Sequence, residues 1–278
     1  MCGIVGYVGA QQAAPILLEG LQKLEYRGYD SAGIAVETND KISIVRRVGK
    51  VEELSNAVED WDVTSTCGIG HTRWATHGVP NDVNAHPHYS ESENIALIHN
   101  GIIENYLELR EFLQQKGVQF ASQTDTEVVA QLMEYCMGLP EVETVSDALY
   151  MVLHRIEGAY ALGILCSDDP DHVYAARKDA PLLIGFGKGE NFIASDVTAL
   201  VKYTRDVVYM DDGEVAVLGR DGVQVYNAME LPIEKEHHHI DWEISAAEKG
   251  GYEHFMLKEI MELSLIHISE PTRRVVIS

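Results

Sequence analysis

The chain has 278 residues, enough for one large domain or two small ones. Hydrophobic residues make up 46% and charged residues 23%, a balance typical of globular proteins rather than of disordered chains. The formal net charge of -23 argues against a nucleic-acid-binding surface, which needs a basic patch, and no stretch has the apolar length of a membrane span. We therefore expect neither a nucleic acid nor a membrane as a partner.

The cysteine pattern and the first residues bear on the cellular location. Glycines interrupt the first apolar run and no basic segment precedes it, so we expect no signal peptide. The four cysteines, Cys2, Cys67, Cys136 and Cys166, have no CxxC spacing, which favours neither a disulfide framework nor a zinc site. The last three lie in apolar runs and are expected to be buried packing residues. We expect a cytoplasmic protein with no metal and no cofactor.

The first half of the chain mixes strands with helices. A β-branched run between glycines predicts a strand over residues 4–8, and apolar residues at helical spacing predict an amphipathic helix over 13–24. By the same criteria, we predict further strands at 32–37, 42–48, 67–71 and 95–100, the last ending at Asn100-Gly101, and further helices at 51–58, 106–116, 126–136 and 146–156.

The second half is rich in strands, which we predict at 159–166, 173–177, 182–185, 192–195, 207–210, 214–218 and 223–226. Strands outnumber helices, and the helices cluster instead of alternating with strands. This order predicts an α+β fold with largely antiparallel sheet. The glycine-rich segment 185–192 lacks the spacing of a phosphate loop and is interpreted as a turn. The histidines at 237–239 cannot all face one site on a regular element, so we interpret them as a polar loop.

The motif MCGIVGY at residues 1–7 places a cysteine directly after the initiator methionine. If Met1 is removed, Cys2 carries both a thiol nucleophile and an α-amine whose pKa of about 7.7–8.0 lets it act as the base. Gly3 would leave steric room for a substrate beside the nucleophile. The alternative is that Cys2 is only a small residue near the start of the chain.

Three further segments suit binding or chemistry, and each also has an ordinary structural interpretation. Arg73 and Trp74 stand side by side in HTRWATHG, where the arginine suits a carboxylate ligand but also suits packing on the ring. In HNG, the Asn100 amide and the Gly101 N–H suit an oxyanion hole, or else a hairpin turn. TDTE at 124–127 supplies a carboxylate just before a helix, or only a helix N-cap.

Taken together, MCGIVGY, LEYRGYDSAG, GHTRWATHG, NAHPH, HNGIIEN and TDTE resemble, in the same order, the motifs of the class II glutamine amidotransferases, which use an N-terminal nucleophile. The resemblance is closest to the glutaminase half of the isomerising glutamine–fructose-6-phosphate aminotransferases, also called glucosamine-6-phosphate synthases. The form YRGYDSAG favours these over the purine-pathway relatives. The resemblance implies a four-layer αββα sandwich of the N-terminal-nucleophile hydrolase type.

The resemblance also implies roles for the motif residues. Cys2 would attack L-glutamine and form a γ-glutamyl thioester, releasing ammonia and then, on hydrolysis, glutamate. Asn100 and Gly101 would hold the developing oxyanion, while Arg73 would bind the α-carboxylate and Asp125 the α-ammonium group of glutamine. The remaining implied residues are Thr76 and His77, which would line the site, Trp74, which would gate it, and Arg27, which would support it.

The resemblance divides the chain into three parts. Residues 2–239 would form the amidotransferase domain, and 240–262 would be the linker and first helix of a sugar-phosphate isomerase domain that is otherwise absent. Residues 263–278 resemble nothing in the family, and we predict that they are non-native sequence, from a frameshift, a truncated read or a cloning scar. Fructose 6-phosphate would be a substrate only of the full-length enzyme, for which a homodimer is also implied.

Two alternatives remain open at this stage. Another amidotransferase of the same class, such as a purine or asparagine synthesis enzyme, would share the nucleophile, although YRGYDSAG and residues 239–262 count against it. A catalytically silent glutamine-binding module would result if Met1 is retained, because Cys2 would then have no free amine. The mass of the N-terminus distinguishes this second alternative.

Overall fold

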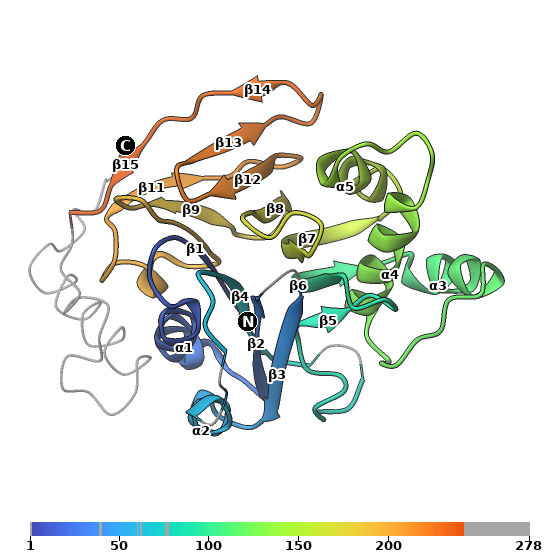
Figure 1. Cartoon of the computed structure of the whole chain (residues 1–278), viewed down its shortest axis with the longest axis horizontal. Helices are drawn as coiled ribbons and strands as arrows, with labels where there is room; N and C mark the ends of the chain where they lie inside the picture. Colours follow the sequence, from blue (N-terminus) through green and yellow to red (C-terminus); the bar gives the residue numbers. More distant parts are fainter. Residues whose placement is uncertain (1, 39–40, 60, 62, 76–77, 242–278) are drawn as a thin grey trace, which may run out of the picture. The chain divides into compact units, whose positions relative to one another are not determined.

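Two antiparallel sheets organise the part of the chain that the computed structural model describes, namely residues 2–38, 41–59, 61, 63–75 and 78–241. The residues up to Ile240 form one compact unit. The first sheet has the strand order β15 (His238–His239), β11 (Asp206–Tyr209), β9 (Leu183–Phe186), β10 (Asn191–Ala194), β1 (Gly3–Val8), β4 (Cys67–Arg73), β2 (Ser31–Glu37) and β3 (Ile42–Val48) (Figure 1). The second has the order β14 (Pro232–Ile233), β13 (Gly222–Tyr226), β12 (Val215–Gly219), β8 (Val173–Lys178), β7 (Gly158–Cys166), β6 (Ile95–Ile103) and β5 (His88–Tyr89).

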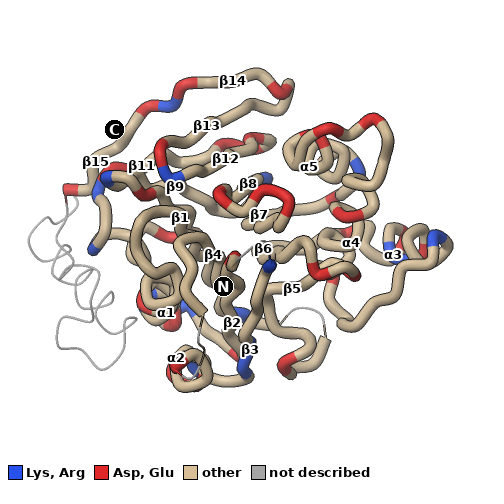
Figure 2. Tube along the Cα trace, in the orientation of Figure 1, with Lys and Arg blue, Asp and Glu red and all other residues tan. Residues whose placement is uncertain are grey.

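The helices fall into two groups, one for each sheet. Helices α1 (Ala13–Leu24) and α2 (Val51–Glu59) lie against the first sheet, and α3 (Tyr106–Gln115), α4 (Asp125–Met137) and α5 (Val145–Leu153) lie on the side of the second (Figure 1). Short 3-10 turns follow α1 at Glu25–Arg27 and β10 at Val197–Ala199. Acidic residues occur on helices, strands and loops alike, so the negative charge is not confined to one element (Figure 2).

Three layers of buried apolar side chains separate these elements. In β6, Leu97 packs with the side chains of α4 and α5, whereas the next residue, Ile98, packs with residues of the first sheet such as Ile4. Successive strand residues point to opposite faces, so the apolar first part of β6, Ile95–Ile98, can fill two cores at once. Leu17 and Leu21 of α1 fill the third core against the outer face of the first sheet. The predicted four-layer αββα fold is confirmed.

Most predicted elements lie within a few residues of the observed ones, but two predictions need correction and two short strands were not predicted. Strand β6 does not end at Asn100-Gly101 but continues to Ile103, because β7 pairs with it along its whole length. The segment 237–239 is not simply a loop, since His238 and His239 form the edge strand β15 paired with β11. The two-residue strands β5 and β14 are too short to show a periodicity.

Other interpretations hold. The segment 185–192 forms the β9–β10 turn, in which the Gly187 N–H donates to the Glu190 carbonyl at 2.8 Å. Cys67, Cys136 and Cys166 are buried, as expected.

The predicted linker and helix within 240–262 lie outside the described residues, apart from Ile240 and Asp241, and so does the segment 263–278.

Candidate active site

Cys2 lies directly before β1, a central strand that pairs with β10 on one side and β4 on the other. Its neighbour Gly3 stands opposite Thr72 of β4. A Cβ atom on Gly3 would lie 2.7 Å from the Thr72 hydroxyl and 2.8 Å from the Leu24 side chain. Packing therefore gives a reason for this glycine besides the predicted room for a substrate, and it fixes the backbone from which Cys2 projects.

One cavity of about 580 Å³ gathers the predicted site residues that the structure describes. The predicted residues in its lining are Cys2, Arg27, Arg73, Trp74, Asn100, Gly101 and Asp125. They come from several separate elements, so the fold brings together motifs that are far apart in the sequence. Thr76 and His77, also predicted for the site, lie outside the described residues.

The Cys2 sulfur is held by the backbone of Trp74. The Trp74 N–H donates to the Cys2 Sγ at 3.1 Å, and the same sulfur lies 3.5 Å from the Trp74 carbonyl oxygen. Burial raises the pKa of the Cys2 thiol, while the hydrogen bond from Trp74 and the charge of Arg73 act in the opposite direction. Because the net effect is upward, the thiol is protonated at neutral pH and needs a base when it attacks.

The Asn100 side chain spans the two sheets. Its Nδ2 donates to the Cys2 carbonyl oxygen at 3.2 Å, and its Oδ1 lies 2.8 Å from Nε2 of His71 on β4. The neighbouring Gly101 has a φ of 133°, and a Cβ atom there would lie 2.0 Å from the Ala159 carbonyl oxygen. Only glycine therefore lets β6 continue past Asn100 in this conformation.

Arg73 is buried and is tied to the loop that follows it. Its Nη2 donates to the Gly78 carbonyl at 3.0 Å, and its Nη1 lies 3.8 Å from the Asp30 carboxylate. The same carboxylate accepts hydrogen bonds from the Ser31 hydroxyl and the Ala75 N–H. Asp30 thus joins the guanidinium group to the backbone that carries Trp74, a role that the sequence did not reveal although Asp30 lies within the motif YRGYDSAG.

The two interpretations of TDTE apply to different residues. Thr124 is the N-cap of α4 and accepts the Glu127 N–H at 3.3 Å. Asp125 lines the cavity, and its Oδ2 accepts the Ile103 N–H at 2.9 Å and lies 3.9 Å from Nδ1 of His99. The capping residue therefore sets the helix start, and the next residue presents a buried carboxylate to the cavity.

Trp74 and Arg27 lie at the rim of the site. Trp74 is 56% exposed, and its ring lies so close to Gly28 that a Cβ atom on Gly28 would be 2.5 Å from Cε3 of Trp74. Arg27 Nη1 lies 3.4 Å from the Ser195 carbonyl and 3.5 Å from the Asp196 carboxylate. Ser195 in turn accepts the Ile4 N–H at 3.0 Å, so Arg27 is tied to the segment that holds β1.

Sequence reasoning missed a group of four buried histidines beside the cavity: His71, His86, His88 and His99. The rings of His71 and His86 stack at 4.2 Å, and His86 meets the edge of His88 at 4.9 Å. Burial lowers the pKa of His71 to about 3 and the pKa values of His86 and His88 well below their usual range. All four stand in the motifs GHTRWATHG, NAHPH and HNGIIEN, yet no spacing indicated that they meet. Within the described residues, no cluster of such side chains is arranged to hold a metal.

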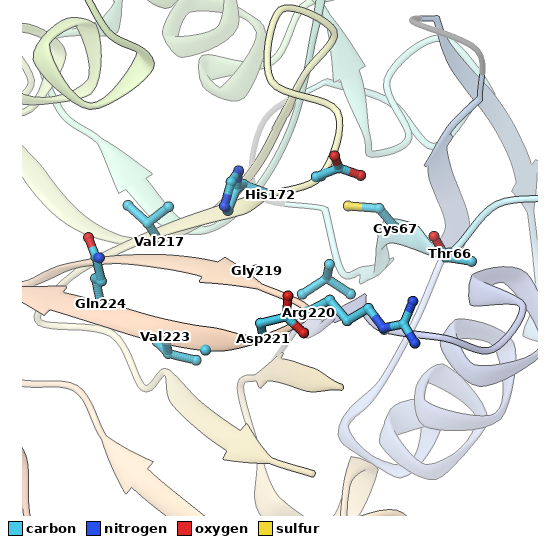
Figure 3. A pocket seen from close by; sticks show the side chains of 13 residues that line it. Thr66, Cys67, His172, Val217, Gly219, Arg220, Asp221, Val223 and Gln224 are labelled. Carbon is cyan, nitrogen blue, oxygen red and sulfur yellow. The ribbon is translucent and has the colours of Figure 1, made fainter. Parts of the chain in front are cut away.

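A second cavity, of about 680 Å³, lies near the opposite end of β1, beside the β12–β13 turn (Figure 3). Cys67, His172, Arg220 and Asp221 are among its lining residues, and none of the residues predicted for the active site lines it. The Cys2 cavity is therefore the candidate active site.

Residues 71–202 match the family described as "Glutamine amidotransferase domain". The chain carries a glutamine amidotransferase domain. The matched span includes Arg73, Asn100, Gly101 and Asp125 from the cavity, and Cys2 lies before it.

Similar proteins extend the comparison beyond the matched span. The chain is 56% identical over 262 residues to the glutamine–fructose-6-phosphate aminotransferase [isomerizing] of Caldanaerobacter subterraneus subsp. tengcongensis, which covers 94% of the chain and 42% of that protein. It is 52% identical to an enzyme of the same name from Thermus thermophilus, with the same coverage. The chain therefore spans less than half the length of these relatives.

Solved structures agree with the fold. The glutamine phosphoribosylpyrophosphate amidotransferase from B. subtilis matches with a TM-score of 0.71 and 28% identity, over 82% of this chain and 49% of that one. A class-II domain protein from Silicibacter pomeroyi, at 17% identity and a TM-score of 0.56, supports the fold alone. No helix in the described part of the amidotransferase domain is long and apolar enough to span a bilayer.

Proposed function

We propose that the domain hydrolyses L-glutamine to glutamate and ammonia through a γ-glutamyl thioester on Cys2. The observation that carries this proposal is the convergence of a nucleophile, amide donors, a guanidinium group and a carboxylate on one cavity. A cysteine alone would not indicate the substrate. Arg73 and Asp125 add opposite charges that suit the α-carboxylate and α-ammonium groups of an amino acid.

The proposed reaction begins with removal of Met1. The α-amine of Cys2 takes the thiol proton, and the sulfur attacks the side-chain amide carbon of glutamine. The Asn100 amide and the Gly101 N–H stabilise the oxyanion, and removal of one such donor typically costs about 2.7–4 kcal/mol. The leaving nitrogen takes the proton from the α-amine and departs as ammonia. Water then cleaves the thioester to glutamate.

Other residues of the cavity would control access to the reaction. Trp74, exposed at the rim and adjacent to the nucleophile through its backbone, would close over bound glutamine. Thr76 and His77 would complete the amino-acid site, and Arg27 would support the segment that holds β1.

We further propose that this domain is the ammonia-supplying half of a longer enzyme, in the cytoplasm. The similar proteins are named for a reaction between glutamine and fructose 6-phosphate, and the chain covers 42% of their length. In such an enzyme, ammonia would pass to fructose 6-phosphate to give glucosamine 6-phosphate, and a homodimer is proposed for that longer form. No nucleic acid takes part.

The test is glutamate release from L-glutamine by the purified chain, with Cys2→Ala as the control and the N-terminal mass determined in parallel. Release by the wild type that disappears in Cys2→Ala supports the proposal. No release from a chain whose mass shows that Met1 is absent would contradict it for the isolated domain. No release from a chain that keeps Met1 would favour the silent glutamine-binding alternative.

A further inference from the structure

The orientation of the Asn100 amide follows from the chemistry of its two neighbours. The Cys2 carbonyl oxygen only accepts hydrogen bonds, so the atom of Asn100 that lies 3.2 Å from it must be the nitrogen. The amide oxygen therefore faces the His71 ring, 2.8 Å from Nε2. This assignment needs no hydrogen positions.

The protonation of His71 follows in turn. Because the Asn100 oxygen accepts, the His71 Nε2 must carry the hydrogen. The ring is completely buried, and burial lowers its pKa to about 3, so it is neutral and has one N–H. That single N–H is the one that faces Asn100.

The plane of the His71 ring is also constrained. His71 stacks on His86 at 4.2 Å with an interplanar angle of 25°, and His86 Nδ1 lies 3.5 Å from the His99 N–H on β6. The ring therefore bridges β4, which carries His71, and β6, which carries Asn100. Such a contact links the two sheets directly beneath the nucleophile.

We propose that His71 is a positioning residue, whose Nε2–H holds the Asn100 amide with its nitrogen toward Cys2 and the reacting oxygen of the substrate. The proposal rests on the proposed glutaminase function. The Asn100 nitrogen has two hydrogens, so one can bind the Cys2 carbonyl while the other meets the oxyanion. If the amide turned over, its oxygen would face the developing negative charge and oppose the reaction.

The matched variants are His71→Gln and His71→Asn. Both place a polar amide in the buried site, but the glutamine nitrogen reaches the position of Nε2, whereas the asparagine nitrogen reaches only that of Nδ1. We expect His71→Gln to keep kcat for glutamine hydrolysis within about threefold of wild type, and His71→Asn to lose about tenfold or more. The KM for glutamine should change less than about threefold in both, because Arg73 and Asp125 are untouched. Equal losses in the two variants would overturn the proposal.

Coupling to Asn100 separates positioning from a general structural role. In an Asn100→Ala background, His71→Asn should cause no further loss of kcat, since the group that it orients is gone. A loss that multiplies the effect of Asn100→Ala would overturn the proposal. Alkylation of Cys2 by iodoacetamide, followed by intact mass, should proceed at the wild-type rate in both histidine variants.

A measurement on the wild-type chain applies even if the variants do not fold or the chain lacks activity. In a ¹⁵N-histidine-labelled sample, the His71 ring should show the Nε2–H tautomer at neutral pH. The Nδ1–H tautomer would overturn the positioning proposal. Absence of glutamate release with the Nε2–H tautomer present would instead count against the proposed function.

Discussion

The two cavities at the ends of β1 each contain a cysteine, and their surroundings differ. Burial raises the pKa of both thiols, but Cys2 has a backbone N–H 3.1 Å from its sulfur and is close to the Arg73 charge, both of which act in the opposite direction. Cys67 is buried, which raises the pKa of its thiol, and the nearby carboxylates of Glu37, Asp171 and Asp169 raise it further. Access to a cavity is therefore not enough for a reactive thiol, since reactivity also needs donors or positive charge beside the sulfur.

The same contrast extends to the other lining residues. The Cys2 cavity combines a buried arginine with a buried carboxylate and an oriented amide. The second cavity contains Arg220 in an exposed turn, together with His172, whose side chain is 39% exposed. A buried charged group loses less of its interaction energy to solvent screening, so a charged substrate should be bound more specifically in the first cavity.

The strongest test of this comparison replaces each of the two cysteines separately by alanine. Cys2→Ala should lower glutamate release by at least about a thousandfold, because the covalent route is lost. Cys67→Ala should leave kcat and KM within about twofold and lower the free energy of unfolding by about 1 kcal/mol or less. Glutamate release and urea unfolding measure these effects. A comparable loss of activity in Cys67→Ala would contradict the distinction between the two cavities.

The next test compares two buried asparagines. Asn100→Ala should lower kcat by about 100- to 1000-fold with little change in KM, as removal of an oxyanion donor does in other enzymes. Asn191 donates to the carbonyl of Gly219, beside the second cavity, at 2.7 Å. Asn191→Ala should therefore cost stability, by about 1–3 kcal/mol, while the kcat of the folded protein stays at the wild-type value. Steady-state kinetics at matched concentrations of folded protein check both expectations.

A smaller effect is expected for the two arginines. Arg73→Gln should raise the KM for glutamine by about 10- to 100-fold, because a charge-assisted contact to a carboxylate contributes about 1.5–3 kcal/mol. Arg220→Gln, at the second cavity, serves as the control and should leave both constants unchanged. A KM that does not move in Arg73→Gln would show that the α-carboxylate binds elsewhere.

The smallest effect concerns the buried histidines beside the Cys2 cavity. The pKa of His71 is lowered to about 3 in the folded chain and would return to about 6.5 on unfolding. Between pH 6.5 and pH 3 the unfolded chain binds more protons than the folded chain. This contribution to the free energy of unfolding is therefore complete above pH 6.5, and it decreases as the pH is lowered below 6.5, by up to about 1.4 kcal/mol per pH unit. Urea unfolding between pH 7.5 and 5 should therefore show a shallower acid loss in His71→Gln than in wild type. Comparing the two chains cancels their shared surface-charge effects, and identical slopes would contradict the expectation.

The residue pattern predicted an α+β fold with largely antiparallel sheet, and the resemblance to the amidotransferase motifs implied the four layers; both are confirmed. The first part of β6, Ile95–Ile98, is apolar on both faces, which makes it visible as a continuous run. Cys2, Arg73 and Asp125 stand in short motifs whose residue types match the chemistry. The structure adds that all three line one cavity, while their individual roles remain predictions.

Other features could not be predicted, because they depend on contacts between distant elements. Strand β6 continues through Asn100-Gly101 because it pairs with β7 there. The Asn-Gly pair by itself indicates a turn, so the local sequence could not predict this continuation. The edge strand β15 depends on β11 and on a 2.7 Å contact between His239 and Asp206. The stack of His71 and His86 arises only when β4 and the segment before β5 meet.

The central place of β1 has a practical consequence for recombinant work on this domain. Because β1 is paired on both sides, the direction in which the chain enters the sheet is fixed, and Cys2 opens directly into the cavity. An affinity tag joined to the amino end would therefore start inside the space proposed for glutamine and would also replace the α-amine by a peptide bond. Purification and immobilisation strategies should keep that end unmodified, or release it with a protease that cleaves immediately before Cys2.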